Sequence, residues 1–544
     1  MEFSKLAEYF EKLEKTPARL EMTAVLAEVF QVAAASEIDK ICFLSLGRLG
    51  PLYDNLEFSL ADRMMVRVLS RAYGVLEPSV TADYKRLGDL GDVGLNLATQ
   101  GHRIETEAQK KGRLTVGEVY RRLTEIAASA GTGSQERKIN LLSDLLKSLD
   151  GLSSKYVIRI PLGKMRLGFS DKTLIEALSW LSKGDKSLKA EIEKAYFVYP
   201  NIGEIARRFK AGGITALEKI TPVPGVPLLP QLCQRVPTAS EILEKVGDEN
   251  GAVIIEPKYD GTRVQLHLDK SQAPNPKHQK QDQKNLEMDL GGYKTPSFLV
   301  KTFTRNLEET TAMFPDLVAG AIKQIAAESV ILDGEAVGFD PKTGKMLPFQ
   351  ETVQRKRKYD ISAKAVEIPL KLHLFDILYL DGRNLMSRPF CERRKILERV
   401  IKDGDVLKVT VQEKIDSSDV LESRLKRAQK EGWEGLVVKS PSAPYAAGSR
   451  GFAWVKFKQE EGGEGGSSRL ADTIDAVVLG YDKGEGKRVS FGIGAFLVGV
   501  YDRDNDRFLT VAKIGTGLTD EQWEELKIKA QRSKIKEIPK NVVI

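Results

Sequence analysis

The sequence has few cysteines and no long hydrophobic run. Cys42, Cys233 and Cys391 are the only cysteines among 544 residues and form no CxxC pair, so neither a disulfide framework nor a four-cysteine zinc site is supported. No stretch approaches the roughly 18 apolar residues of a membrane-spanning helix, and the first residues do not resemble a secretion signal. We therefore expect an unprocessed protein of a reducing cytoplasm, without a membrane partner.

A large excess of charge is also absent. Lys and Arg number 83 and Asp and Glu 76, a formal net charge of +7. This mild basic excess is compatible with a polyanionic partner but does not identify one. Charged residues make up 29% and apolar residues 42% of the chain, which is typical of a protein that buries real cores. The length corresponds to about three or four domains.

The first 220 residues have the periodicity of helices. Apolar side chains recur at helical spacing in residues 3–13 and again in residues 174–178. Thr16 and Pro17 are predicted to open a second helix, as a cap followed by a first-turn proline. Basic residues are frequent, most visibly in residues 159–168. From the pattern alone we interpret these basic runs as solvated helix faces.

The composition changes at the proline-rich segment 221–230, which we interpret as an extended connector and a domain boundary. Beyond it, alternating apolar and polar side chains in residues 264–269 and the apolar run 372–380 predict strands of a mixed sheet with helices. Residues 270–294, rich in Gln, Lys, Asn and Pro, are predicted to form an exposed insertion. Residues 460–468, rich in Gly, Glu and Ser, are predicted to form a flexible hinge.

Three more strands are predicted after this hinge, at residues 476–479, 495–500 and 507–511. A short helix carrying Trp523 follows, with Thr519 as its cap. We interpret this region as the start of a small β-barrel that the sequence leaves incomplete.

The candidate chemistry begins with a lysine beside a predicted turn. Residues 256–263 read EPKYDGTR between an apolar strand and the alternating strand. Asp260 and Gly261 are a tight-hairpin signal, so Lys258 is expected at a strand end beside a turn. Alone, such a lysine is most simply a solvated charge. Five further motifs follow in order: FTRN at 303–306, LDGE at 332–335, LFD at 374–376, EGLVVK at 434–439 and WVKFK at 454–458.

Together, these motifs resemble those of the nucleotidyltransferase superfamily of ATP-dependent DNA ligases, RNA ligases and capping enzymes, whose first motif is KxDG. The large helical region and its segment 159–168 resemble the DNA ligases of archaeal and eukaryotic replication, so the resemblance covers the whole chain. It implies a multidomain protein with an all-α DNA-binding domain (1–222), an α+β nucleotidyltransferase domain of the ATP-grasp-like ligase type (223–459) and a truncated OB-fold β-barrel (460–544).

The resemblance implies an enzyme that seals nicks in duplex DNA in three steps. Lys258 takes AMP from ATP, AMP passes to the 5′-phosphate of the nick, and the 3′-hydroxyl then displaces AMP. ATP and Mg²⁺ are the implied cofactors, and nicked double-stranded DNA is the implied partner. A sliding clamp is a further partner that the resemblance allows. The protein is expected to act as a monomer, with the chromosome in the cytoplasm, in DNA replication, repair and recombination.

The resemblance also implies roles for the motif residues. Glu335 and Glu434 correspond to carboxylates that face the metal, although both could be ordinary strand-end acids; hard oxygen ligands suit Mg²⁺. Phe375 corresponds to the aromatic ring that stacks on adenine, the alternative being core packing. Lys258 must lose its proton from a pKa of about 10.4, and we expect nearby cations and a metal to lower that pKa. The other nucleotide-binding candidates are Glu256, Arg263, Arg305, Lys439, Arg450 and Lys456.

One motif of the family has no counterpart. These ligases end their barrel with a basic RxDK motif, and none follows Trp454, so either the sequence is truncated or the protein adenylates poorly. Two alternatives follow: a nick-binding protein with little self-adenylation, and an RNA ligase or capping-type nucleotidyltransferase. The zinc module of NAD-dependent bacterial ligases is excluded by the cysteine count. NAD⁺ or ADP as an additional donor stays open.

Overall fold

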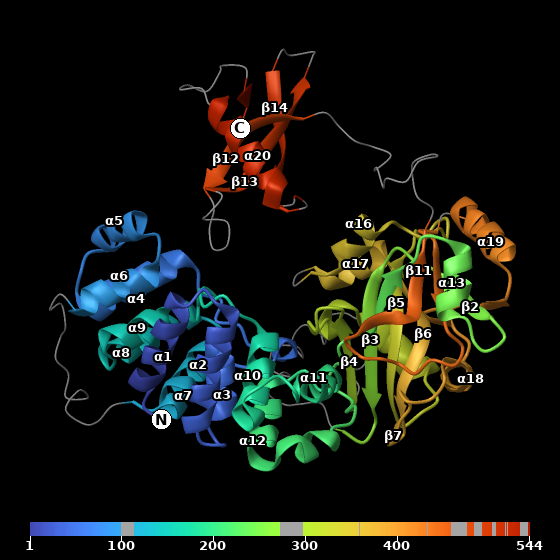
Figure 1. Ribbon diagram of the computed structural model, residues 1–544, viewed down its shortest axis with the longest axis horizontal. Helices are drawn as coiled ribbons and strands as arrows, with labels where there is room; N and C mark the ends of the chain where they lie inside the picture. The colour runs from blue at the N-terminus through green and yellow to red at the C-terminus, as the bar shows by residue number, and fades with distance from the viewer. Residues whose placement is uncertain are drawn as a thin grey trace. The chain divides into compact units, whose positions relative to one another are not determined.

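The structure is a computed structural model that describes residues 1–99, 114–272, 298–357, 360–431, 433–458, 476–483, 492–502, 507–516, 518, 520–533 and 542–543. The chain forms two compact units, Met1–Lys458 and Gln459–Ile544. The described part of the first unit contains a helical region followed by β-sheets, and that of the second contains a sheet with a helix (Figure 1). None of the described helices is long and apolar enough to cross a bilayer.

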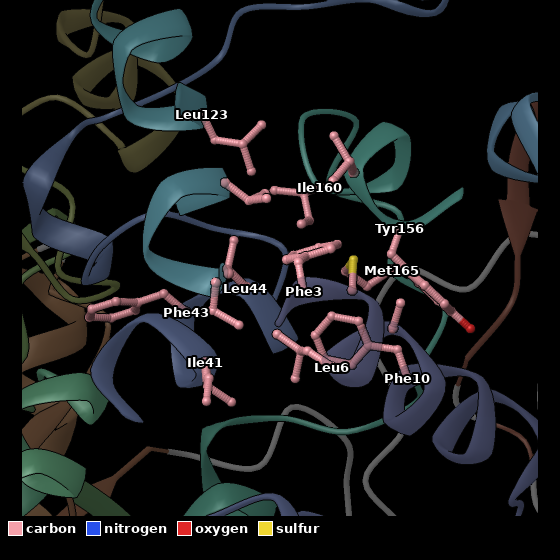
Figure 2. Packing of buried hydrophobic residues seen from close by; sticks show 14 of the residues in the cluster. Phe3, Leu6, Phe10, Ile41, Phe43, Leu44, Leu123, Tyr156, Ile160 and Met165 are labelled. Carbon is pink, nitrogen blue, oxygen red and sulfur yellow. The ribbon is translucent and has the colours of Figure 1, made fainter. Parts of the chain in front are cut away.

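The helical region shares one hydrophobic core. Phe10 of α1 meets Tyr156 of α9 edge to face, with ring centroids 5.3 Å apart (Figure 2). The helices predicted at 3–13 and 174–178 are confirmed as α1 and α10. The region consists of α1 (Phe3–Lys15), α2 (Arg19–Val32), α3 (Ile38–Ser45), the short η1 (Leu52–Asp54), α4 (Asp62–Tyr73), α5 (Glu77–Leu87), α6 (Leu90–Thr99), α7 (Val116–Ala128), α8 (Ser134–Lys147), α9 (Gly151–Arg159), α10 (Asp171–Lys183), α11 (Lys189–Val198) and α12 (Ile202–Glu218).

The prediction that Thr16 and Pro17 open the second helix is wrong. The Thr16 hydroxyl donates to the carbonyl oxygen of Lys12 at 2.7 Å, and the helix begins only at Arg19, without a side-chain cap. A threonine hydroxyl can bond either forward to an amide or back to a carbonyl four residues earlier. Here it bonds back, so Thr16 ends α1.

The interpretation of residues 159–168 as a solvated face is wrong for Arg159. Its side chain is 1% exposed, and its guanidinium nitrogens lie 3.0 Å from carboxylate oxygens of Glu14 and Asp89 and 3.5 Å from Asp92. These carboxylates come from α1 and the start of α6, so the pairing joins three helices. The two later basic residues of the segment are about half exposed.

Two sheets with covering helices make up the rest of the first unit. The first sheet has the order β1-β11-β10-β2-β9 and the second β4-β3-β5-β6-β7, with β8 paired to β6. The strands are β1 (Leu232–Arg235), β2 (Val253–Pro257), β3 (Thr262–Asp269), β4 (Leu299–Thr304), β5 (Ser329–Gly338), β6 (Leu370–Leu380), β7 (Arg383–Asn384), β8 (Leu407–Val409), β9 (Glu413–Ile415), β10 (Leu436–Lys439) and β11 (Arg450–Phe457). The helices are α13 (Ala239–Val246) and α19 (Ser418–Lys430) on the first sheet, α15 (Pro315–Gln324) and α18 (Phe390–Val400) on the second, and the short η3 (Thr311–Met313), α16 (Phe349–Thr352), η4 (Val353–Arg355) and α17 (Ile361–Glu367).

The hairpin predicted at Asp260 and Gly261 is wrong, because β2 and β3 belong to different sheets. A Cβ placed on Gly261 would lie 2.4 Å from the carbonyl oxygen of Ala336 in β5, so glycine permits a close approach. Asp260 accepts a hydrogen bond from the backbone amide of Phe349 at 3.1 Å. The Asp-Gly pair therefore marks the crossing from one sheet to the other, and Lys258 lies at that crossing.

The predicted strand at 264–269 is confirmed as β3, but its polar face is covered. Gln265 and His267 are 4% and 0% exposed. Gln265 exchanges two hydrogen bonds with the backbone of Leu228, and His267 accepts one from the amide of Gly225. The connector 221–230 has neither helix nor strand, as predicted. The connector binds along β3 and covers its polar face, so that this alternating strand is buried on both faces.

Among its described residues, the second unit has a sheet of the order β12-β13-β14-β15 and one helix, α20 (Asp520–Arg532). Trp523 of α20 stacks on Phe496 with ring centroids 5.4 Å apart. The three predicted strands and the helix are thus confirmed. Of the predicted insertion 270–294 only the first three residues are described, and the predicted hinge 460–468 and cap Thr519 lie outside the described residues. The strands are β12 (Val477–Lys483), β13 (Ile493–Asp502), β14 (Arg507–Ile514) and β15 (Val542–Val543).

Candidate active site

A cavity of about 560 Å³ is lined by residues of both sheets in the first unit. Eight of its lining side chains are basic and four are acidic. The basic excess makes the cavity suited to an anion. All ten residues predicted from the motifs line it: Glu256, Lys258, Arg263, Arg305, Glu335, Phe375, Glu434, Lys439, Arg450 and Lys456.

Lys258 is fixed by its own backbone. Its amide donates to the carbonyl of Gly435 at 3.0 Å, and its carbonyl accepts from the amide of Glu434 at 3.2 Å. Its ammonium contacts the Glu434 carboxylate. Burial lowers the pKa of Lys258, while the carboxylates of Glu335 and Asp260 act in the opposite direction. The pKa of Lys258 is lowered, as expected. The cause is burial of the ammonium group and not the neighbouring cations that we expected to lower it.

The two candidate metal ligands lie on opposite sheets. Glu335 of β5 pairs in register with Arg263 of β3, and burial raises the pKa of Glu335 to about 7 in spite of the nearby Arg263 and Lys258. Glu434, just before β10, contacts the ammonium groups of Lys258 and Lys458. The described residues contain no group of three acidic, His or Cys side chains that could hold a metal alone. A cation bound by these carboxylates would need further oxygens from ligand or water.

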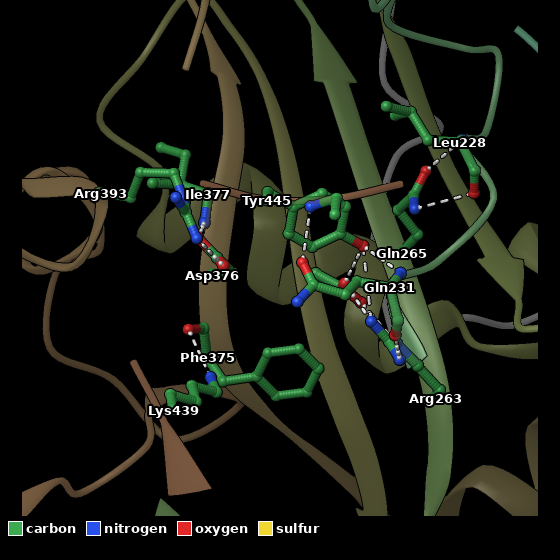
Figure 3. A network of polar contacts seen from close by, with 12 residues as sticks. Leu228, Gln231, Arg263, Gln265, Phe375, Asp376, Ile377, Arg393, Lys439 and Tyr445 are labelled. Carbon is green, nitrogen blue, oxygen red and sulfur yellow. Dashed lines mark hydrogen bonds and ion pairs between the residues drawn. The ribbon is translucent and has the colours of Figure 1, made fainter. Parts of the chain in front are cut away.

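Arg263 of the cavity wall forms an ion pair with a buried carboxylate, Asp333. Its Nη2 lies 2.6 Å from Asp333, which is 0% exposed, and its Nη1 donates to the carbonyl of Gln231 at 2.6 Å. The Tyr445 hydroxyl donates to the same Asp333 at 2.8 Å, and Figure 3 shows Arg263, Gln231 and Tyr445 close together. The guanidinium lies 5.4 Å from the ring centroid of Phe375. Asp333 thus fixes Arg263, a contact that the LDGE motif alone does not reveal.

Lys439 is enclosed rather than presented to solvent. Its side chain is 1% exposed, and its Nζ lies 2.7 Å from Oε2 of Glu256. The ring centroids of Phe375, Phe390 and Trp454 lie between 4.4 and 4.7 Å from the same Nζ, and Figure 3 shows Lys439 beside Phe375. Burial raises the pKa of Glu256 while Lys439 opposes the rise. Lys439 therefore lies within one wall of the cavity, where it contacts Glu256 and the aromatic rings.

Several lining residues were not predicted. Val437 lies two positions before Lys439 on β10, so strand alternation places both on one face. That spacing could have identified Val437. Cys233 of β1 also lines the cavity, but nothing in the sequence connects it with the motifs. Arg305 and Arg450 are exposed at the cavity, and Lys456 is half-buried.

Three family models match the chain. The model described as DNA ligase N terminus matches residues 2–179, that described as ATP dependent DNA ligase domain matches 297–458, and that described as ATP dependent DNA ligase C terminal region matches 490–542. The matches therefore fall in the helical region, in the two-sheet region and in the second unit.

Curated relatives align over nearly the whole chain. A probable DNA ligase of Dictyoglomus turgidum is 40% identical over 543 residues, which are 100% of this chain and 85% of the relative. A DNA ligase of Pyrobaculum calidifontis is 38% identical, covering 96% and 82%, and one of Sulfolobus acidocaldarius is 35% identical, covering 98% and 85%. Among solved structures, one named Pmar-Lig_PreS3 covers 97% of this chain and 91% of its own at a TM-score of 0.52 and 16% identity, a likeness of fold.

Proposed function

Because the chain belongs to the family of ATP-dependent DNA ligases, we propose that the cavity between its sheets binds ATP and that Lys258 takes the AMP. The chain is an enzyme that joins DNA at nicks with the use of ATP.

The observation that supports this proposal most is the convergence of all six motifs on one basic cavity. They are spread over about two hundred residues and come from two sheets. Transfer of a phosphoryl group is catalysed mainly by correct positioning and by cations that stabilise the charge of the group. A cavity with eight basic and four acidic side chains offers both.

Lys258 is the nucleophile in this proposal. Its Nζ lone pair forms a bond to the α-phosphorus, the bond to the bridging oxygen breaks, and pyrophosphate leaves with that electron pair. Burial helps, because it lowers the pKa of Lys258 and so favours the neutral amine. The Glu434 carboxylate in contact with the ammonium is a ready acceptor for the proton. Arg305, Arg450 and Lys456 stabilise the phosphates, and Phe375 stacks on the base.

Mg²⁺ fits two of the lining side chains. Glu335 and Glu434 supply hard oxygen donors, and the bound ion would neutralise charge on the triphosphate.

The rest of the chain is proposed to hold the DNA. Residues 1–222 form the DNA-binding domain, 223–459 the nucleotidyltransferase domain and 460–544 the OB-fold domain. Exposed Lys164 and Arg166 of the helical region suit phosphate contacts, so binding should weaken steeply with salt and depend little on sequence. We propose that the chain seals 5′-phosphate nicks in DNA replication, repair and recombination.

The test uses α-labelled ATP with Mg²⁺, followed by a nicked duplex. The wild type should take up the label and then seal the nick. Lys258→Ala should take up none, while Lys395→Ala, which removes an exposed lysine of α18 outside the cavity, should behave as the wild type. A wild type that binds nicked DNA but takes no label would instead be a nick-binding protein, and labelling from GTP would indicate a capping-type enzyme.

A further inference from the structure

The three cysteines lie in three different surroundings. Cys42 is 0% exposed in the helical core, and Cys391 of α18 is exposed to solvent. Cys233 is partly buried and lines the proposed nucleotide cavity. The chain therefore carries one thiol at the cavity, Cys233. The buried Cys42 and the exposed Cys391 serve as thiols for comparison.

The strand that carries Cys233 leaves space beside it. Cys233 of β1 lies opposite Gly451 of β11, and the register of the two strands shifts directly after it. A Cβ placed on Gly451 would meet no atom within 4 Å. Cys233 also packs against the hydrophobic cluster that includes Phe375 and Trp454. The thiol thus borders the slot in which the adenine is proposed to stack, with room for a small added group.

The cavity has features of a ligand site that do not depend on the cysteine. Nε1 of Trp454 has no hydrogen-bond partner among the described residues, and Oε1 of Glu256 has none either but lies 3.7 Å from Nη1 of Arg394. Trp454 and Glu256 are 2% and 3% exposed, and both line the cavity. Buried polar atoms without partners cost stability unless a ligand or water satisfies them.

The charges around Cys233 favour its thiolate once it forms. Burial raises the pKa of the Cys233 thiol, and the cations Arg263, Lys439, Lys258 and Lys456 oppose that rise. The thiolate, which is the reactive form, is therefore a minor species at neutral pH that four cations stabilise. An anionic ligand in the cavity would both cover the thiol and neutralise these cations.

We propose that Cys233 is a thiol-exchange site that blocks ATP loading when it carries a small disulfide-linked group. The Cys233 thiolate attacks a small disulfide RSSR, the S–S bond of RSSR breaks, a Cys233–S–S–R bond forms, and RS⁻ leaves and takes up a proton from solvent. The group R then occupies the adenine slot. Excess small thiol reverses the reaction by the same exchange. This inference rests on the proposed role of the cavity as the ATP site.

The first experiment measures exchange in a Cys391→Ser chain, in which Cys233 is the accessible thiol. Dithiodipyridine is the disulfide, and the thiopyridone that it releases is followed by absorbance. One thiol per chain should react, because Cys42 is buried. With Mg²⁺ withheld and ATP at about ten times its Kd, the rate should fall about tenfold, because about a tenth of the sites remain free. Unchanged exchange with ATP, or no exchange at all, would overturn the proposal.

The second experiment measures AMP labelling before and after treatment. Treated Cys391→Ser should lose labelling in proportion to the modified fraction and recover it with dithiothreitol. The Cys233→Ala, Cys391→Ser chain is compared only with its own untreated rate, and that ratio should stay near one. Full modification of Cys233 without loss of labelling would contradict the inference alone. An untreated chain that never takes up label would contradict the proposed function instead, whereas ATP protection of Cys233 would still be measurable.

Discussion

Arg159 in the helical region and Glu335 in the cavity are both ionisable groups that the fold desolvates, and they differ in whether oppositely charged neighbours outweigh that desolvation. The carboxylates around Arg159 raise its pKa in spite of burial, so the fold favours its charge. Burial raises the pKa of Glu335 to about 7 although two cations are near, so the fold disfavours its charge. The helical region uses buried charge to join helices, whereas the cavity holds a carboxylate whose charge its surroundings disfavour.

The largest expected effect is a loss of stability when the buried charge of Arg159 is removed from the helical region. Arg159→Met would remove the buried cation beside Asp89, which is 4% exposed, and leave it paired with the half-exposed Arg166 at 3.1 Å. Loss of one partner of a buried ion pair typically costs about 3–5 kcal/mol, and we expect that loss in the free energy of unfolding from urea titration. Arg121→Met, at a 67% exposed position, should change it by less than about 0.5 kcal/mol. Equal effects of the two substitutions would remove the contrast.

The next effect tests the cavity side through pH. The folded-state pKa of Glu335, about 7, lies above its ordinary value of 4.5. Its protonated form therefore contributes stability that is fully present below about pH 4.5 and is lost as the pH rises through about 7, by up to about 3 kcal/mol. Glu335→Gln stays neutral, so in a metal-free buffer it should be more stable than the wild type at about pH 8 and nearly equal at about pH 5.

Glu328→Gln is the matched control, because Glu328 is 79% exposed. Its unfolding free energy should follow that of the wild type at both pH values. A Glu335→Gln chain whose advantage did not change with pH would mean that the carboxyl is not held above its ordinary pKa. The same substitution should weaken AMP labelling, because it removes a proposed metal ligand.

The smallest effect concerns the proposed adenine slot. Phe375→Leu keeps an apolar side chain but removes the aromatic face, a contribution of about 0.5–1.5 kcal/mol. We expect the KM for ATP in AMP labelling to rise about three- to tenfold, with a small change in kcat. Phe452→Leu removes a ring that is 44% exposed and does not line the cavity, so its KM should match that of the wild type. A changed kcat with an unchanged KM would place Phe375 outside the slot.

The sequence predicted the elements well, because they depend on local spacing. Lys258, Glu335 and Phe375 were predicted in another way, through the resemblance of six ordered motifs to a known family. Long-range contacts were not predictable from local spacing. The Asp-Gly pair after Lys258 has the local pattern of a hairpin, but the sheet that each flanking strand joins is decided by distant partners.

Burial was the other quantity that local patterns could not supply. Arg159 and Lys164 look alike as basic residues of one segment, but one is 1% and the other 48% exposed. The difference arises because Glu14, far along the chain, reaches Arg159 across a helix packing. The same limit explains why the pKa of Lys258 was expected to respond to cations, when its main determinant is desolvation.

The parallel pairing of β1 with β11 determines how this enzyme can be divided. β1 precedes the nucleophile and β11 follows every other motif strand, so the adenylation region is closed by its own two ends. A fragment that starts after Arg235 would leave β11 as an open edge and remove Leu232 and Cys233 from the cavity wall. Any shortened, independently folding adenylation fragment must therefore begin ahead of β1, on the connector.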